Sequence, residues 1–161
     1  MKKSKNQISL ECFDDYLFLN RILEVLNTIN EDAKILIFCE RKKQVDILET
    51  DLRISGYRVS GMHGSKSQDT REQAINDFRT LKTNILVATD VASRGLHVEN
   101  IAAVINYDFP LQIEDYVHRI GRTGRAGAKG AAYSFFTKRN LMLAPKLIQV
   151  NSSFNFCFSK S

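Results

Sequence analysis

Continuous apolar runs that alternate with helix-period segments most restrict how this 161-residue chain can fold. The runs Lys34–Cys39 and Ile85–Thr89 are apolar without alternation, which is typical of strands buried on both faces of a parallel sheet. Between these runs, Val45, Leu48 and Leu52 recur at helical spacing. Because parallel strands need crossover connections, the pattern predicts an α/β fold, a doubly wound and mostly parallel sheet with helices on both faces.

The same two periods continue along the rest of the chain. They predict helices over residues 16–28, 42–55, 67–78 and 115–120, and strands over 34–39, 57–60, 85–89, 102–107 and 131–136. Ser67 has the side chain of a helix N-cap, and Gly56 is placed to end the helix before it. In such a fold, ligands bind beyond the carboxyl ends of the strands.

The end of the sequence departs from this regular alternation. Pro145 interrupts the helical pattern, and residues 151–161 have no helical period. We therefore divide the chain into an N-terminal extension (1–7), one α/β domain (8–144) and an irregular tail (145–161). We interpret the tail as a truncated terminus, with a functional element as the alternative.

Composition restricts the setting in which the protein works. A hydrophobic content of 43% with 25% charged residues indicates one soluble globular domain, and the net charge of +5 suits a polyanionic partner without requiring one. The three cysteines form no C-x-x-C pair, which indicates a reducing compartment. No run approaches the roughly 18 apolar residues of a membrane span, so we expect a monomer in the cytoplasm or nucleus without membrane contact.

A glycine-rich segment near residue 120 carries an unusual set of arginines. Arg119, Arg122 and Arg125 are spaced by three residues, and the glycines follow the same step. The amphipathic stretch before them predicts a helix that ends among the arginines, and glycines there allow positive φ. Planar, permanently charged guanidinium groups in such a turn suit the binding of phosphate oxygens. A basic surface loop is the alternative interpretation.

Several motifs in one order give the chain a family resemblance. The segment Tyr116–Gly127 resembles the sixth motif of superfamily 2 helicases in its DEAD-box form, and His118 distinguishes it from groups that usually carry glutamine there. The resemblance runs from about Ile8 to about Thr137. Other matching segments are Ile35–Glu40 (motif IV), His63-Gly64 with Gln68 and Arg71 (motif IVa), Ile85–Leu96 (motif V) and Val104–Pro110 after it.

The resemblance implies the C-terminal RecA-like domain of a DEAD-box ATP-dependent RNA helicase. It assigns Arg122 and Arg125 as arginine fingers aimed at the γ-phosphate of ATP, and His118 as a link between two domains. A histidine satisfied on a helix surface is the alternative for His118. The resemblance also places Arg94 and His97 at the nucleotide. His97 replaces the family's aspartate, and a neutral imidazole can still accept a hydrogen bond from the ribose but supplies no negative charge.

The resemblance further implies that Gly64, Gln68, Arg71 and Thr89 contact the RNA backbone. Polar and cationic side chains of this kind bind phosphates and sugars without reading sequence. Each residue also has a structural alternative. Thr89, for example, can cap the turn after its strand. Phe38 is expected in the core, although the family uses this aromatic residue to steady the finger arginines.

For Arg71, the alternative role is an ion pair on its own helix face, with Glu72 or Asp77.

The chain also lacks a P-loop and a D-E-x-D motif, the groups that hold ATP and Mg²⁺ in this class of enzyme. We therefore expect the chain to be inactive alone and to depend on the N-terminal RecA-like domain of the same helicase for both. Two other functions remain: a stand-alone RNA- or protein-binding module without catalysis, and a DNA-directed superfamily 2 helicase, which His118 and the Q-x-x-R pattern disfavour.

Overall fold

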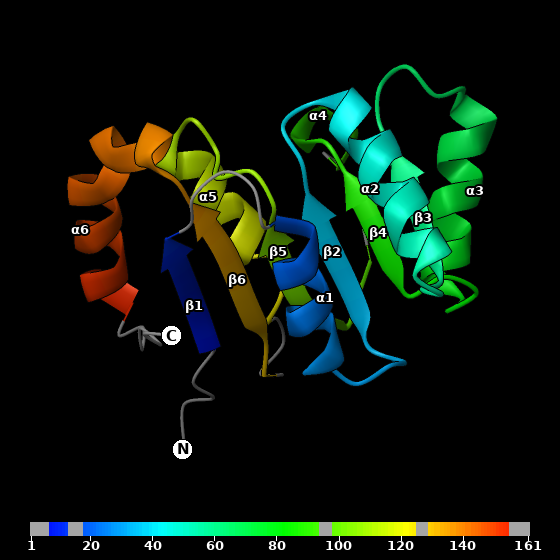
Figure 1. Cartoon of the computed structure of the whole chain (residues 1–161), viewed down its shortest axis with the longest axis horizontal. Coiled ribbons are helices and arrows are strands. Elements are labelled where there is room, and N and C mark those ends of the chain that lie inside the picture. The colour runs from blue at the N-terminus through cyan, green and yellow to red at the C-terminus, as the bar shows by residue number, and fades with distance from the viewer. Residues whose placement is uncertain (1–6, 13–17, 94–97, 125–128, 155–161) are drawn as a thin grey trace.

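The computed structural model describes residues 7–12, 18–93, 98–124 and 129–154 of the chain. These residues form one six-stranded sheet of order β1-β6-β5-β2-β4-β3, and every strand pair in it is parallel (Figure 1). The strands are β1 (Gln7–Cys12), β2 (Lys34–Phe38), β3 (Val59–Met62), β4 (Ile85–Ala88), β5 (Ile101–Asn106) and β6 (Ala131–Phe136). The predicted parallel α/β architecture is confirmed.

Helices connect these strands and cover both faces of the sheet (Figure 1). They are α1 (Phe18–Asn27), α2 (Lys42–Ile54), α3 (Gln68–Arg79), α4 (Asp90–Ser93), α5 (Ile113–Ile120), the 3₁₀ helix η1 (Lys138–Leu143) and α6 (Ala144–Phe154). Alternate residues of β2 divide the core: Ile35 and Ile37 pack with α1 and α2, whereas Leu36 and Phe38 pack with α3. Helices α5 and α6 share a third apolar cluster against β6.

Local signals in the sequence act as predicted at two helix ends. The Ser67 hydroxyl accepts a hydrogen bond from the Thr70 amide at 3.2 Å and caps α3. Gly56 has a φ of +90° after α2, where the Tyr57 amide bonds to the Leu52 carbonyl at 3.0 Å. The strand expected at 57–60 begins two residues later, at Val59, since the Tyr57 amide is still bonded to the last turn of α2.

Both chain ends differ from the prediction. Gln7, assigned to an extension, is the first residue of β1 and lies opposite Ala131 of β6. The expectation of an irregular tail from residue 145 is wrong up to Phe154, because α6 begins at Ala144. Pro145 is its second residue, where an amide has no partner within the helix and proline costs nothing. Leu147 of α6 is buried. Residues 155–161 lie outside the described part of the chain.

Candidate functional site

The carboxyl ends of the central strands carry most of the predicted site residues. The chain leaves β2 at Phe38, β4 at Ala88 and β5 at Asn106, and these three strands are neighbours in the sheet. The ends are tied together, because the Glu40 amide donates to Asp108 Oδ2 at 2.8 Å. This edge therefore forms one surface, as expected for a doubly wound sheet.

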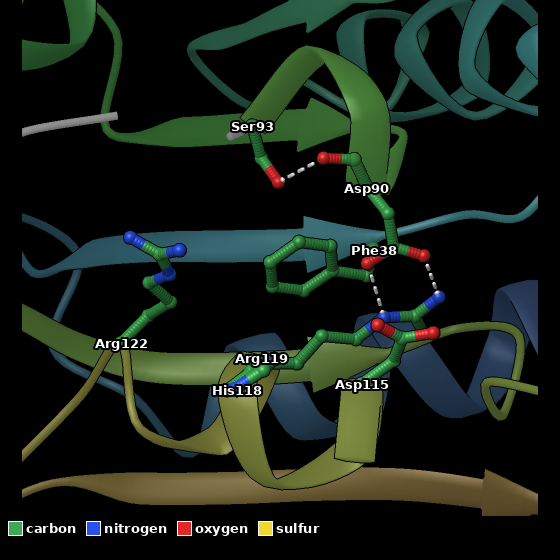
Figure 2. Close-up of a pocket in the computed structure, with 7 residues that line it drawn as sticks. All are labelled: Phe38, Asp90, Ser93, Asp115, His118, Arg119 and Arg122. Carbon is green, nitrogen blue, oxygen red and sulfur yellow. Dashed lines mark hydrogen bonds and ion pairs between the residues drawn. The ribbon is translucent and has the colours of Figure 1, made fainter. Parts of the chain in front are cut away.

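Arg119 of α5 is the organising side chain of this edge (Figure 2). It is buried and donates through Nε and Nη2 to the two carboxylate oxygens of Asp90, at 2.7 and 2.5 Å. Its Nη1 donates to the carbonyl of Asp108 at 2.7 Å and to Asn106 Oδ1 at 3.3 Å. Its guanidinium carbon lies 5.0 Å from the centre of the Phe38 ring.

These contacts correct one sequence interpretation and resolve another. Arg119 does not share the phosphate-binding role inferred for the three arginines, because its guanidinium bonds within the domain. Phe38 is a core residue, as expected, and its ring also lies against the guanidinium of Arg119. A bidentate arginine–carboxylate pair with further acceptors is a fixed arrangement. It holds α5 against α4 and the end of β5.

A pocket of about 60 Å³ opens beside this arginine network. Besides Phe38, Asp90 and Arg119, its lining comprises Ser93, Asp115, His118 and Arg122. In Figure 2 the Phe38 ring lies between Arg122 and the Arg119–Asp90 pair. Within the described part of the chain, the side chains of His118 and Arg122 form no hydrogen bond or ion pair, so their donors are available to a ligand.

The backbone after α5 fixes the direction in which Arg122 leaves the helix. The amides of Gly121, Arg122 and Thr123 each bond back into the last turn of α5. The Thr123 hydroxyl also donates to the Ile101 carbonyl at 2.6 Å, which ties the loop to the start of β5. Thr123, the loop residue after Arg122, is thus anchored. The guanidinium of Arg122 itself makes no such bond among the described residues.

The glycines of the loop have different structural roles. Gly124 adopts a φ of +67°, as predicted for a glycine-rich turn, but Gly121 has an ordinary φ of −68°. Gly130 is required by a close approach, since a Cβ there would lie 2.3 Å from Thr123 Oγ1. The regular glycine spacing therefore reflects at least two constraints rather than one repeated turn.

The second set of predicted site residues lies around the ends of β3 and β4. Gly64 is exposed, and beyond its two chain neighbours no described residue has a heavy atom within 4 Å of where its Cβ would be. Gln68 and Arg71 share the first turn of α3, and Arg71 Nη2 donates to Gln68 Oε1. The proposed ion pairs of Arg71 with Glu72 or Asp77 are not formed among the described residues. Arg71 Nε is buried and has no partner there.

Thr89 joins the two sets of residues. Its amide donates to the Met62 carbonyl at 3.3 Å, and its own carbonyl accepts from the Ser93 amide at 3.0 Å as α4 begins. The next residue is Asp90, the partner of Arg119. A ligand that moves Thr89 therefore acts on the residue that directly precedes Asp90, the partner of Arg119 beside the pocket.

Burial raises the pKa of two side chains at this edge, Cys39 and Tyr107. It raises the pKa of the Cys39 thiol well above its ordinary value, and the charge of Asp108 raises it further while Arg119 opposes the shift. Cys39 is thus a buried core thiol without thiolate character. Burial likewise raises the pKa of Tyr107 to about 12, with smaller contributions from Cys39, Asp108 and Asp51.

Three predicted residues, Arg94, His97 and Arg125, lie outside the described part of the chain. Sequence reasoning in turn missed the partnership of Asp90 with Arg119, and the pocket residues Ser93 and Asp115. The sequence does place Asp90 directly after a buried strand, at the edge where ligands bind. The pairing itself joins residues 29 apart in sequence and has no local signal.

Comparison with known proteins identifies the family. The family model described as the helicase conserved C-terminal domain matches residues 17–127. DEAD-box ATP-dependent RNA helicase 20 of Arabidopsis thaliana is 48% identical over 131 residues, which cover 81% of this chain and 26% of that protein. The chain therefore belongs to the helicase C-terminal domains of the DEAD-box ATP-dependent RNA helicases, and it spans about a quarter of the length of this relative.

Solved structures agree with this assignment. The Escherichia coli DEAD-box protein SrmB, bound to regulator of ribonuclease activity A, matches with a TM-score of 0.80 and 32% identity, covering 92% of this chain and 87% of that one. The RNA helicase Prp28 of Chaetomium thermophilum, bound to ADP, matches with a TM-score of 0.87 and 31% identity, over 99% of this chain and 39% of that one. The RecA-like fold implied by the motifs is confirmed. Among the described helices, none is long and apolar enough to cross a membrane.

Proposed function

We propose that this domain supplies one half of the catalytic site of an ATP-dependent RNA helicase. The other half is the N-terminal RecA-like domain of the same helicase, which carries the P-loop and the acidic residues that hold ATP and Mg²⁺. The observation that carries the proposal is the pair of unengaged side chains, His118 and Arg122, beside the fixed Arg119 network. A pocket of about 60 Å³ is far below the roughly 300–1,000 Å³ of ordinary ligand pockets, so a second surface has to complete it.

In this arrangement Arg122 approaches the γ-phosphate together with Arg125. Negative charge redistributes over the phosphate oxygens during transfer, and a guanidinium already in place stabilises it without reorganising solvent. Arg119 and Thr123 keep the end of α5 in position, so that less rearrangement is needed when the domains close. His118, exposed on α5, is placed to contact the partner domain.

The RNA backbone lies on the second set of residues, Gly64, Gln68, Arg71 and Thr89. The exposed glycine allows close approach of a sugar-phosphate chain, and the Gln68–Arg71 pair presents donors to phosphate oxygens. Because no base edge is read, binding is independent of sequence and sensitive to salt. At the nucleotide, Arg94 and His97 complete the contacts of this domain, with His97 accepting a hydrogen bond from the ribose.

The test is RNA-stimulated ATP hydrolysis by the full-length helicase that contains this domain. Arg122→Lys keeps the charge and loses the planar fork, so the maximal rate should fall by about 10²-fold or more while ATP and RNA affinities change little. Arg58→Lys is the matched control, because Arg58 directly precedes β3 and pairs with Asp32 at the amino-terminal ends of the strands, away from the pocket. This variant should leave the rate unchanged. A normal maximal rate in Arg122→Lys contradicts the proposal.

A further inference from the structure

A row of charged residues on α2 faces the edge strand β3 and the loop that follows it. Lys42, Asp46, Glu49 and Arg53 are spaced by four, three and four residues, so they lie along one side of the helix. We call these four residues the polar stripe. The apolar residues of α2, among them Leu48, face the core instead.

Each member of the polar stripe contacts β3 or the loop of residues 63–67. The contacts are Lys42 Nζ to Ser65 Oγ at 2.6 Å, Asp46 Oδ1 to His63 Nε2 at 2.9 Å, Glu49 Oε2 to Lys66 Nζ at 2.6 Å, and Arg53 Nη2 to the Val59 carbonyl at 3.4 Å. Three of the four reach the loop. This loop leads directly into the first turn of α3, where Gln68 and Arg71 lie.

His63 is the most buried member of this set, with 6% of its surface exposed. Its Nδ1 accepts a hydrogen bond from the Ser65 amide at 3.3 Å, so Nε2 of the neutral ring carries the hydrogen and donates to Asp46. Both ring nitrogens are therefore used, one within the loop and one to α2. The imidazole thus links the backbone of the loop, at Ser65, to Asp46 of α2.

Gly61 of β3 makes room for the second connection. A Cβ at this position would lie 2.2 Å from Glu49 Oε2, so any side chain here displaces the carboxylate. The glycine thus permits the Glu49–Lys66 pair, whose side chains are only 14% and 19% exposed. A partly sheltered pair of this kind holds its geometry better than an exposed one. On the other side of the loop, a backbone bond from Thr89 to Met62 joins β4 to the end of β3.

We propose that Asp46, Glu49 and His63 are positioning residues, which hold the loop of residues 63–67 so that Gln68 and Arg71 meet the RNA backbone. This inference rests on the proposed RNA contacts of α3. Preorganisation of a binding loop lowers the entropy lost on binding. The polar stripe therefore contributes to RNA affinity without touching RNA.

Removal of an acidic charge from the polar stripe distinguishes positioning from general electrostatics, because the two predict opposite changes in RNA affinity. Asp46→Asn and Glu49→Gln each make the chain more basic than its net charge of +5, so general electrostatics predicts tighter RNA binding. Loss of positioning predicts weaker binding, by about fivefold, which corresponds to about 1 kcal/mol. Asp51→Asn is the matched control: it removes the same charge from the same helix, at a carboxylate for which the described structure shows no bond to the loop.

The measurement is fluorescence anisotropy of a labelled polyuridine of roughly 12 nucleotides, titrated at low salt with the full 161-residue chain. Arg71→Ala is the reference variant and should flatten the slope of log affinity against log salt by about one unit. Gly61→Ala adds a variant without charge change, which should also weaken binding. Thermal unfolding of every variant corrects each affinity for the folded fraction.

Each outcome decides something. Weaker binding by Asp46→Asn and Glu49→Gln, with Asp51→Asn equal to the unmodified chain or tighter, supports positioning. Unchanged or tighter binding by both variants overturns it while the RNA contact of Arg71 stands, and so does equal weakening by Asp51→Asn. If Arg71→Ala binds RNA as the unmodified chain does, the proposed RNA contact is wrong and the inference about the polar stripe falls with it.

Discussion

Replacement of Arg119 by lysine should destabilise the domain far more than replacement of an exposed arginine. The guanidinium of Arg119 contacts three acceptor groups, namely the Asp90 carboxylate, the Asp108 carbonyl and the Asn106 amide oxygen. A lysine ammonium at this depth can retain one of these contacts, because it lacks the planar fork. At least two hydrogen bonds to a charged group are then lost.

The magnitude follows from those lost contacts. Hydrogen bonds that involve a charged group contribute about 1.5–3 kcal/mol each, and part of the loss is recovered by relaxation, so we expect about 3 kcal/mol of destabilisation. This is a large share of the roughly 5–15 kcal/mol that stabilises a domain. It corresponds to a fall of about 6–12 °C in melting temperature for a chain of this size.

The assay is urea unfolding followed by circular dichroism, with Arg58→Lys as the control. Arg58 also has three acceptors, including Asp32 at 2.8 Å and the Leu81 carbonyl at 3.0 Å, but its side chain is 46% exposed. Water replaces what lysine loses there, so the control should change the free energy of unfolding by about 0.5 kcal/mol or less. Equal losses in the two variants at an unchanged m-value would falsify the argument from burial.

Three further predictions concern catalysis, nucleotide binding and titration. The isolated chain should show no RNA-stimulated ATP hydrolysis, since it lacks a P-loop, and turnover by a pure preparation that Arg122→Ala abolishes contradicts this. In the full-length helicase, His97→Asp should tighten apparent ATP affinity on the order of tenfold at nearly constant maximal rate, because a charged acceptor binds the ribose more strongly; a change in maximal rate alone refutes the ribose contact. The Tyr107 phenol should ionise near pH 12, and since its folded pKa is raised above the unfolded value near 10, the stability it contributes is present below about pH 10 and is lost as the pH rises through 12. The difference in phenolate absorbance between the unmodified chain and Tyr107→Phe isolates this one of the five tyrosines. A titration step near pH 10 in that difference contradicts the prediction.

The central strands could be predicted from sequence because their burial on both faces leaves a continuous apolar signal. Strands β2 and β4 lie inside the sheet and are buried throughout almost their whole length, and both were located correctly. Strand β1 is at the edge of the sheet, and its sequence alternates Ile8, Leu10 and Cys12 with polar residues over only six positions. Its partner β6 lies more than 100 residues away, so no local pattern marks the pairing.

The sequence does not predict helix α6, because Pro145 interrupts the helical pattern there. Proline is unfavourable inside a helix but acceptable in its first turn, and the two cases differ only in where the helix begins. Here the preceding 3₁₀ helix, capped by Thr137, brings the chain to Ala144 in helical conformation. The apolar contacts of Leu147 with the α5 cluster then stabilise α6. Tertiary packing thus decided a segment that local preference left open.

The candidate site shows the same division between local and tertiary information. The motif around α5 located Arg122 and His118 at the pocket, but it assigned all three arginines the same chemistry. Residues 119 and 122 differ because α5 ends between them: Arg119 is still on the helix and points toward Asp90, whereas Arg122 follows Gly121 and remains unengaged. A spacing of three residues, close to one helical turn, predicts a shared direction only while the helix continues. The site therefore contains one arginine that builds the surface and one that the surface presents, and the end of α5 separates the two roles.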